Sequence, residues 1–362
     1  MCSWSWTVLT ASIIYSTPSA IVCGVPQGSV LGPILFLLYV ADLLSLVRRH
    51  QLSPHAFADD TQIYGLCRPG STDDLSRRVS NCVDDVTSWM RANRLQLNPS
   101  KTEVLWCSSG RRQHQIQTTA IRICSTFVQP ATTVRNLGVF IDTDVSMKAH
   151  IAATVRSCFA ALRLVRSVRR CLPHQALLTL IRALVVSKVD YCCSVLAGVS
   201  GHLLDRLQSV LNAAARLIFS ARRSDHITPL LHDLHWLRVP ERIQFRLCVL
   251  AFRCLHGTAP TYLAESLQRT TAVEGRRHLR SADTLLLTIP PTQRSTLGDR
   301  SFPAAAARSW NRLPVSIRNA SSVATFRRHL PFQLLYQLDL LSSVTLTFSS
   351  ALGLVLSVSF NH

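Results

Sequence analysis

Two long stretches of this chain carry apolar residues at helical spacing. The first lies within 71–98, where the apolar positions stand three or four residues apart: Leu75, Val79, Cys82, Val83, Val86, Trp89 and Met90. This stripe predicts an amphipathic helix that ends before Pro99. The second lies within 151–172 and ends before Pro173: Ile151, Val155, Phe159, Leu162, Val165 and Val168. Both stripes are typical of core packing and not of a ligand site.

Shorter apolar runs predict strands and one further helix. The strands are expected at Val104–Cys107, Ile121–Phe127 and Leu137–Ile141, and a buried helix at Ile34–Val40. Beyond residue 145 the pattern is helical only, with helices over 177–189 and 203–218. The pattern therefore predicts a mixed α/β part up to about residue 145, followed by a mainly α-helical region.

Two adjacent aspartates, Asp59 and Asp60, lie between the short apolar pairs 56–57 and 63–64. This arrangement predicts a hairpin with both carboxylates at its turn. Like charges held together in apolar surroundings repel each other, and a divalent cation with oxygen ligands relieves that repulsion. Such a pair suits two-metal phosphoryl transfer. The alternative is an ordinary turn whose aspartates are solvated.

A glycine-containing string lies upstream of the aspartates: Gly24-Val25-Pro26-Gln27-Gly28-Ser29-Val30-Leu31-Gly32-Pro33. Glycine lets the backbone approach a ligand closely, and a glycine loop that opens a helix offers free N–H groups to phosphate or sugar. The string lacks the Gly-Lys-Ser/Thr ending of a Walker loop. The alternative is a plain loop in front of a core helix.

Together these strings resemble two motifs of the reverse transcriptases encoded by non-LTR (LINE-type, jockey-like) retrotransposons. The resemblance extends from about Ser16 to about Leu330. It includes further strings in the order of the family: LNPSKTE at 97–103, NLGVFID at 136–142, HITPLLHDLHWL at 226–237, GDRSF at 298–302 and WNRLP at 310–314.

The resemblance implies an α/β palm fragment followed by a mainly α-helical, thumb-like and C-terminal region. In residue ranges it implies a remnant upstream of the palm over 1–23, a partial palm over 24–145, a helical thumb-like module over 146–270, a C-terminal family region over 271–330 and an apolar tail outside the family over 331–362.

The resemblance also implies roles for single residues. Asp59 and Asp60 would be catalytic and hold Mg²⁺, with Lys101 as a cation or proton donor beside the leaving pyrophosphate. The template and the incoming dNTP would meet Gly24, Pro26, Gln27, Gly28 and Ser29. The grip on the DNA primer would be formed by Asn136, Leu137, Gly138, Val139 and Phe140. From the residues alone, the pattern favours a surface lysine at a helix-to-strand turn for Lys101, and 136–140 reads as an ordinary buried strand.

The family's first catalytic motif, which carries another metal-binding aspartate, has no counterpart here, because residues 1–23 contain neither Asp nor Glu. Two-metal catalysis needs ligands that hold both ions about 3.5–4 Å apart. We therefore expect a 5′-truncated copy of an RNA-directed DNA polymerase that is inactive alone. Asp42 is the nearby acidic residue, but its place favours a helix end. The alternative is a non-catalytic nucleic-acid-binding remnant or a pseudogene product.

The charge of the chain favours a polyanionic partner. Its net charge is +19, and arginine supplies nearly all of it, because the lysines are Lys101, Lys148 and Lys188. On the second helical stripe a set of arginines lies largely off the apolar face, and we predict that they follow a nucleic-acid backbone: Arg156, Arg163, Arg166, Arg169 and Arg170. The alternative is the solvated face of an amphipathic helix.

Cysteine and histidine patterns show no standard metal spacing. The 12 cysteines include no Cys-x-x-Cys pair, which suits a reducing compartment, nucleus or cytoplasm. Two loose groups are more typical of packing than of zinc binding: Cys248, Cys254 and His256, and His226, His232 and His235. The uncharged stretch 340–360 is rich in Ser and Thr, so we interpret it as sequence outside the family and not as a membrane anchor.

Overall fold

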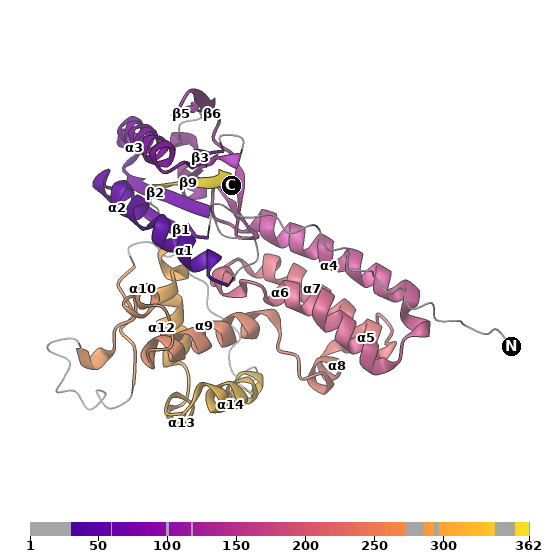
Figure 1. The fold of residues 1–362 in the computed structure, drawn as a ribbon. Coiled ribbons are helices and arrows are strands. Elements are labelled where there is room, and N and C mark those ends of the chain that lie inside the picture. The colour runs from indigo at the N-terminus through magenta and orange to yellow at the C-terminus, as the bar shows by residue number, and fades with distance from the viewer. Residues whose placement is uncertain are drawn as a thin grey trace.

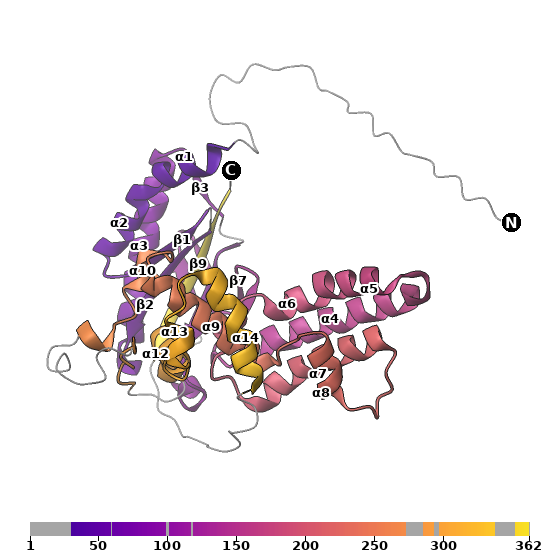
Figure 2. The same ribbon diagram turned by 90° about the horizontal axis from the view of Figure 1, so that it is seen from below.

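The computed structural model describes residues 30–58, 60–98, 101–116, 119–272, 285–292, 297–336 and 352–361. Within these residues the chain forms a sheet with helices packed on it, a bundle of longer helices beside the sheet, and a C-terminal group of helices (Figure 1). Figure 2 shows the bundle extending away from the sheet, and the C-terminal helices pack against a helix of the bundle.

The central sheet is antiparallel at every pairing. Its strands are β1 (Ser53–Phe57), β2 (Asp60–Cys67), β3 (Gln96–Leu97), β4 (Glu103–Cys107) and β9 (Leu352–Asn361). β1 and β2 form a hairpin, β9 lies beside β2, and β4 and β3 pair with β9 on its other side. The predicted hairpin at the aspartates and the predicted strand at Val104–Cys107 are confirmed.

Helices α2 (Ala41–Arg49) and α3 (Thr72–Ala92) pack on the sheet around one apolar core. The predicted stripe of α3 is buried there, apart from Trp89, which is half-buried. Gly65 of β2 makes the close packing possible, since a Cβ at this position would lie 2.6 Å from a methyl group of Leu75.

Helix α1 (Gly32–Tyr39) follows the glycine string as predicted, but the expectation that it is buried is wrong. Ile34 is 55% exposed and Leu38 is 69% exposed. An apolar run becomes buried only where another surface covers it, and among the described elements α1 packs mainly against α2.

Two small hairpins follow the sheet: β5 (Ile121–Ile123) with β6 (Thr126–Val128), and β7 (Thr133–Asn136) with β8 (Val139–Asp142). The expected single strand Ile121–Phe127 is the first hairpin, because the chain reverses at Cys124 (φ 55°). It is tied to α3 by an ion pair in which Arg122 Nη2 lies 2.6 Å from Asp84 Oδ2.

Beyond Asp144 the next elements are helical, as predicted: α4 (Lys148–Val168), α5 (His174–Ile181), a π-helical turn (Arg182–Val186), α6 (Ser187–Asp190), α7 (Gly201–Phe219), α8 (Ile227–Asp233), α9 (Val239–Leu255) and α10 (Thr261–Ala264). One apolar core joins α4, α5, α7 and α9. Val168, predicted to lie in the α4 stripe, is 47% exposed because it stands at the end of the helix.

Arg242 of α9 donates to Asp190 of α6 at 2.8 Å, so this largely buried pair is hydrogen-bonded.

The C-terminal helices are α11 (Leu297–Arg300), α12 (Phe302–Asn311), α13 (Val315–Arg318) and α14 (Val323–Tyr336). Trp310 packs with Phe252 and Phe326 in a third apolar core. Its indole N–H donates to Leu285 O, and the Asn311 side chain bonds both the N–H and the C=O of Leu287. The 310–314 string is therefore an anchor for the preceding segment.

Part of the C-terminal tail, which was expected to lie outside the family, belongs to the fold. Helix α14 continues past Leu330, and Leu352–Asn361 forms strand β9 in the middle of the sheet. Every residue of β2, from Asp60 to Cys67, has a partner in β9. Among the described residues, no helix is both long enough and apolar enough to cross a membrane.

Ending the chain at residue 351 should therefore destabilise the sheet. Without β9, the facing edges of β2 and β4 lose their hydrogen-bond partners and become open to association. We expect a lower thermal midpoint, by about 2–4 °C for each kcal/mol lost, together with more aggregation. Circular dichroism melting and light scattering measure both, with a chain ending at residue 360 as control. Equal midpoints for the two shortened chains would contradict a stabilising role of β9.

Candidate functional site

The candidate metal-binding carboxylates lie at the tip of the β1–β2 hairpin. Phe57 pairs with Asp60, which leaves a two-residue turn of Ala58 and Asp59. Ala58 takes a left-handed conformation (φ 51°), as a tight hairpin turn requires. Asp60 is half-buried at the first position of β2, while Asp59 lies outside the described residues. The hairpin thus presents Asp60 at one end of the sheet.

The same end of the sheet carries Lys101. Asp60 pairs with Ser359, and Glu103, at the start of β4, pairs with Ser357. Lys101, two positions before Glu103, therefore lies near the level of Asp60 with β9 between them, roughly 9–10 Å away by strand spacing. Its side chain is exposed, so a surface lysine and a cation beside a leaving group remain equally compatible with its position.

Glu103 is a further carboxylate that the sequence patterns did not reveal. Directly paired residues of an antiparallel sheet point to the same face. Gln62 and Glu103 both pair with Ser357, so they share a face with Asp60, opposite the buried Ile63 and Val104. Asp42 instead begins helix α2 and is exposed.

The described residues only partly fit a magnesium site. Carboxylates such as those of Asp60 and Glu103 are oxygen ligands of the kind that Mg²⁺ prefers. However, no group of three or more His, Cys, Asp or Glu within metal-binding reach occurs in the described part of the chain. A two-ion site would therefore need Asp59 and further oxygen ligands.

The predicted primer grip is a hairpin and not one strand. Asn136 ends β7 and pairs with Val139, the first residue of β8. Leu137 (φ 43°) and Gly138 (φ 83°) form the turn between them, and both have the positive φ of a type I′ hairpin. Phe140 continues β8, with the guanidinium of Arg135 5.8 Å from the centre of its ring.

Two side-chain hydrogen bonds fix this hairpin against its neighbours. Gln62 Nε2, two residues after Asp60, donates to Asn136 Oδ1 and so joins the hairpin of the aspartates to the predicted primer grip. From the helical side, Tyr191 Oη donates to Leu137 O at 2.6 Å. The hairpin of the aspartates and the predicted primer grip are therefore in contact, although Gln62 and Asn136 are 74 positions apart in the sequence.

The predicted arginines of α4 lie on its solvent side. Arg156, Arg163, Arg166 and Arg170 are exposed, and Arg169 just after the helix is half-buried. Among the described residues none of the five forms an ion pair, in contrast to Arg122 and Arg242. Their charges are thus available to an anionic partner.

Cys248 and Cys254 are buried packing residues, whereas His226, His232 and His235 are exposed. Burial raises the pKa of the Cys248 and Cys254 thiols, so both stay protonated near neutral pH and are poor metal ligands. His256 stacks on Phe252 with ring centres 3.8 Å apart. His232 and His235 lie 6.4 Å apart and belong to no metal-binding group of described residues.

The template loop, predicted at Gly24, Pro26, Gln27, Gly28 and Ser29, lies outside the described residues. Gln62 and Tyr191 were not predicted as site residues. Neither stands in a recognisable motif, and each is found only through its contact with the hairpin at 136–140.

Residues 2–141 match the family described as "Reverse transcriptase (RNA-dependent DNA polymerase)". This range begins upstream of the expected start at Ser16 and ends within β8. It therefore includes the β1–β2 hairpin, α1 to α3 and the whole of the predicted primer grip at 136–140.

Curated relatives agree with the family match. The chain is 26% identical to the "Probable RNA-directed DNA polymerase from transposon BS" of Drosophila melanogaster, over 63% of this chain and 26% of that protein. It is also 26% identical to the corresponding protein of transposon X-element, over 63% of this chain and 25% of that protein. A "Retrovirus-related Pol polyprotein from type-1 retrotransposable element R1 2" of Nasonia vitripennis is 26% identical over 55% of this chain and 48% of that protein.

The chain thus spans about a quarter of the length of the first two relatives. No solved structure matches it significantly. Over residues 2–141 the chain therefore resembles a reverse transcriptase. The relatives that it matches are probable RNA-directed DNA polymerases of transposons and a Pol polyprotein of a type-1 retrotransposable element.

Gly138→Ala should destabilise the hairpin. The left-handed conformation of Gly138 costs a residue with a Cβ roughly 1–2 kcal/mol, and the new Cβ would lie 3.3 Å from the Tyr191 ring. Denaturant unfolding measures the loss. Gly257→Ala, with φ 67° and open space, isolates the backbone strain, and Gly110→Ala, in open space without a positive φ, serves as the neutral control. A loss at Gly138 no larger than at Gly110 would contradict the turn.

Proposed function

We propose that this chain is the palm and thumb part of an RNA-directed DNA polymerase that copies the RNA of its element into DNA. The hydrogen bond from Gln62 to Asn136 is the observation that carries the proposal. Templated synthesis requires the 3′ end of the primer to lie beside the metal-binding carboxylates. The bond holds the hairpin of Asp60 against the hairpin proposed to grip that end.

The proposed roles follow from the positions of the residues. Asp59 and Asp60 would hold Mg²⁺, which would supply positive charge to activate the primer hydroxyl and to balance the departing pyrophosphate. Lys101 places a positive charge at the same end of the sheet. The backbone of 136–140 holds the primer end, and the resemblance assigns the template and the incoming dNTP to the string at 24–29.

The RNA template and DNA primer are the partners that the charge of the chain supports. A net charge of +19 attracts any polyanion, and arginine side chains bind phosphate through paired donors. The unpaired arginines of α4 offer such donors along one side of the helix.

A second candidate function is nucleic-acid binding without catalysis. The position opposite Asp60 on the neighbouring strand belongs to Ser359, and β9 contains neither Asp nor Glu. Residues 1–23 contain none either. A polypeptide of these 362 residues would therefore bind primer and template but lack a ligand for the second ion.

We predict that this 362-residue polypeptide shows no primer extension on an RNA template with Mg²⁺ or Mn²⁺. The physical reason is the incomplete set of carboxylates around Asp60. Incorporation of labelled dNTP on an annealed primer measures the activity. Incorporation that disappears in Asp60→Ala would overturn the prediction. In that case, incorporation that is also lost in the separate variant Glu103→Gln, but kept in Asp42→Asn, would identify Glu103 as the additional ligand.

The α4 arginines should account for much of the salt dependence of binding. Each phosphate contact releases counterions, so the log–log salt slope changes by about 0.9 per contact on B-DNA. Replacing Arg156, Arg163 and Arg166 with Gln should weaken binding for all sequences alike and flatten the slope by up to about three units. Filter binding at several salt concentrations measures this, on protein whose helical content is verified by circular dichroism.

The matched control removes the same charge from exposed positions elsewhere, with Gln at Arg48, Arg49 and Arg91. This triple variant should retain the steeper slope. If both triple variants have the same slope as the unchanged chain, the α4 arginines are only a solvated helix face.

A further inference from the structure

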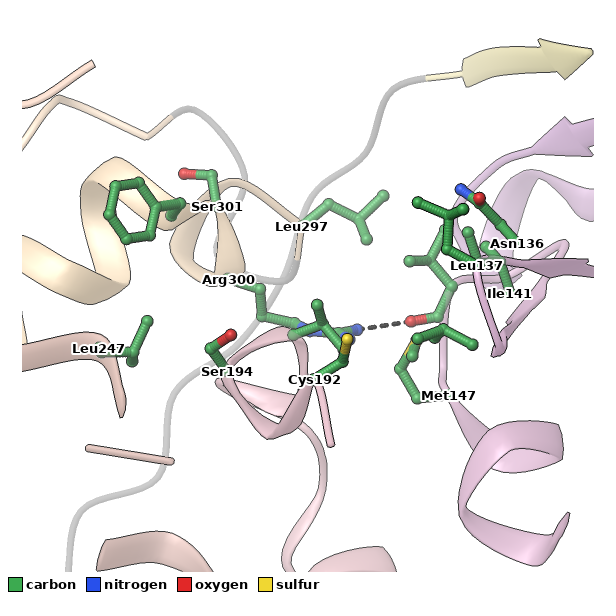
Figure 3. Close-up of a pocket in the computed structure, with 14 residues that line it drawn as sticks. Asn136, Leu137, Ile141, Met147, Cys192, Ser194, Leu247, Leu297, Arg300 and Ser301 are labelled. Carbon is green, nitrogen blue, oxygen red and sulfur yellow. Dashed lines mark hydrogen bonds between the residues drawn. The ribbon is translucent and has the colours of Figure 1, made fainter. Parts of the chain in front are cut away.

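Arg300 lies where the palm, the helical bundle and the C-terminal helices meet. It ends α11, and its side chain extends toward the turn after β8 (Figure 3). Its Nη1 donates to Val145 O at 2.6 Å, and its Nε donates to Ala197 O at 3.0 Å. These two carbonyls belong to segments 155 and 103 positions away in sequence. One guanidinium thus joins three distant segments.

The loop at Gly198 is shaped for this side chain. Gly198 has a left-handed backbone (φ 66°), and a Cβ there would lie 2.6 Å from Arg300 Cγ. Any larger residue would displace the arginine. No described carboxylate forms an ion pair with Arg300, although Asp144 attracts it, so its hydrogen bonds to backbone carbonyls define its place.

The turn that Arg300 holds is strained. Val145 has φ 51° and Met147 has φ 65°. A β-branched residue such as valine rarely adopts a left-handed conformation, and such residues persist only where their surroundings hold them. This turn is the covalent connection from β8 to α4, so its conformation sets the direction in which the hairpin leaves the bundle.

The hairpin has little direct packing on this side. A cavity of about 460 Å³ lies between Asn136 and Leu137 on one wall and Arg300 and Ser301 on the other (Figure 3). Val139 and Ile141 pack on the bundle core, but side chains do not fill the space beside Asn136 and Leu137, so contacts across it contribute little. The polar connections at its edges add to the packing, and Arg300 supplies one of them.

We propose that Arg300 is a positioning residue for the β7–β8 hairpin. By holding the Val145 carbonyl, it fixes the hairpin relative to the helical bundle, and so it fixes the primer end relative to Asp60. This second step rests on the proposed function of 136–140. The first step concerns the fold alone and is tested separately.

The experiment uses the full chain with three single variants. Arg300→Lys keeps the charge but removes the planar fork that reaches both carbonyls. Gly198→Ala displaces Arg300 from another segment. Arg308→Lys is the matched control, because Arg308 donates to Asp299 at 2.7 Å in the same group of helices but does not contact the hairpin. Hydrogen exchange with peptide resolution follows the amides of 137–147, α3 and α9.

We expect the exchange of 137–147 to be about tenfold faster in Arg300→Lys and Gly198→Ala, the order of effect of one hydrogen bond to a charged group. Exchange in α3 and α9 should stay unchanged, and Arg308→Lys should leave 137–147 unchanged. In a Val145→Gly background, which relieves the strain, Arg300→Lys should have a smaller effect. This background also serves if the single Arg300 variant does not fold.

A functional readout accompanies the exchange. Affinity for a duplex with a recessed 3′ end is compared with affinity for a blunt duplex of equal length, and Arg300→Lys should reduce the preference for the recessed end. Unchanged or uniformly faster exchange would overturn the positioning role. Faster exchange of 137–147 with an unchanged preference would overturn the link to the primer end. A parent chain without any preference would instead refute the proposed function of 136–140.

Discussion

Directional polar contacts, added to the packing of Val139 in the apolar core of the bundle, hold the β7–β8 hairpin, and the geometry of the candidate site depends on them. Gln62 reaches it from the hairpin of the aspartates, Tyr191 from the bundle, and Arg300 holds the turn at its base. Leu137 at its tip is 40% exposed, and a cavity lies on one side. Hydrogen bonds are directional, so these contacts fix an orientation that packing alone would leave variable.

Local periodicity predicted the elements whose burial is decided within one segment. The stripes of α3 and α4 lie in their cores, because a helical face of fixed spacing needs only one surface to cover it. The hydrophobic pattern gave wrong predictions where burial depends on segments that are distant in the sequence. Helix α1 is as apolar as a core helix but exposed, and Leu352–Asn361 enters the sheet although its sequence suggested a separate tail. Neither the pairing of distant strands nor the covering of a helix by a distant segment can be recognised from the local sequence.

The candidate site was predictable to the extent that motifs mark it. Asp60 lies at a hairpin tip, and 136–140 forms a second hairpin joined to it. Glu103, Gln62 and Arg300 were not recognised as site residues, because strand register and contacts between distant segments gave them their positions. A residue that acts by holding a backbone carbonyl has no characteristic neighbours in sequence, and so only the fold reveals it.

The central claim is that 136–140 holds the primer end beside Asp60. Photocrosslinking from a primer with a photoreactive 3′-terminal nucleotide, annealed to an RNA template, tests it most directly. The account predicts that mass spectrometry locates the crosslink in peptides containing 136–140 or the tip of the β1–β2 hairpin. The crosslink should be lost when the reactive group is moved to the 5′ end. A crosslink confined to α4 or the C-terminal helices would contradict the account.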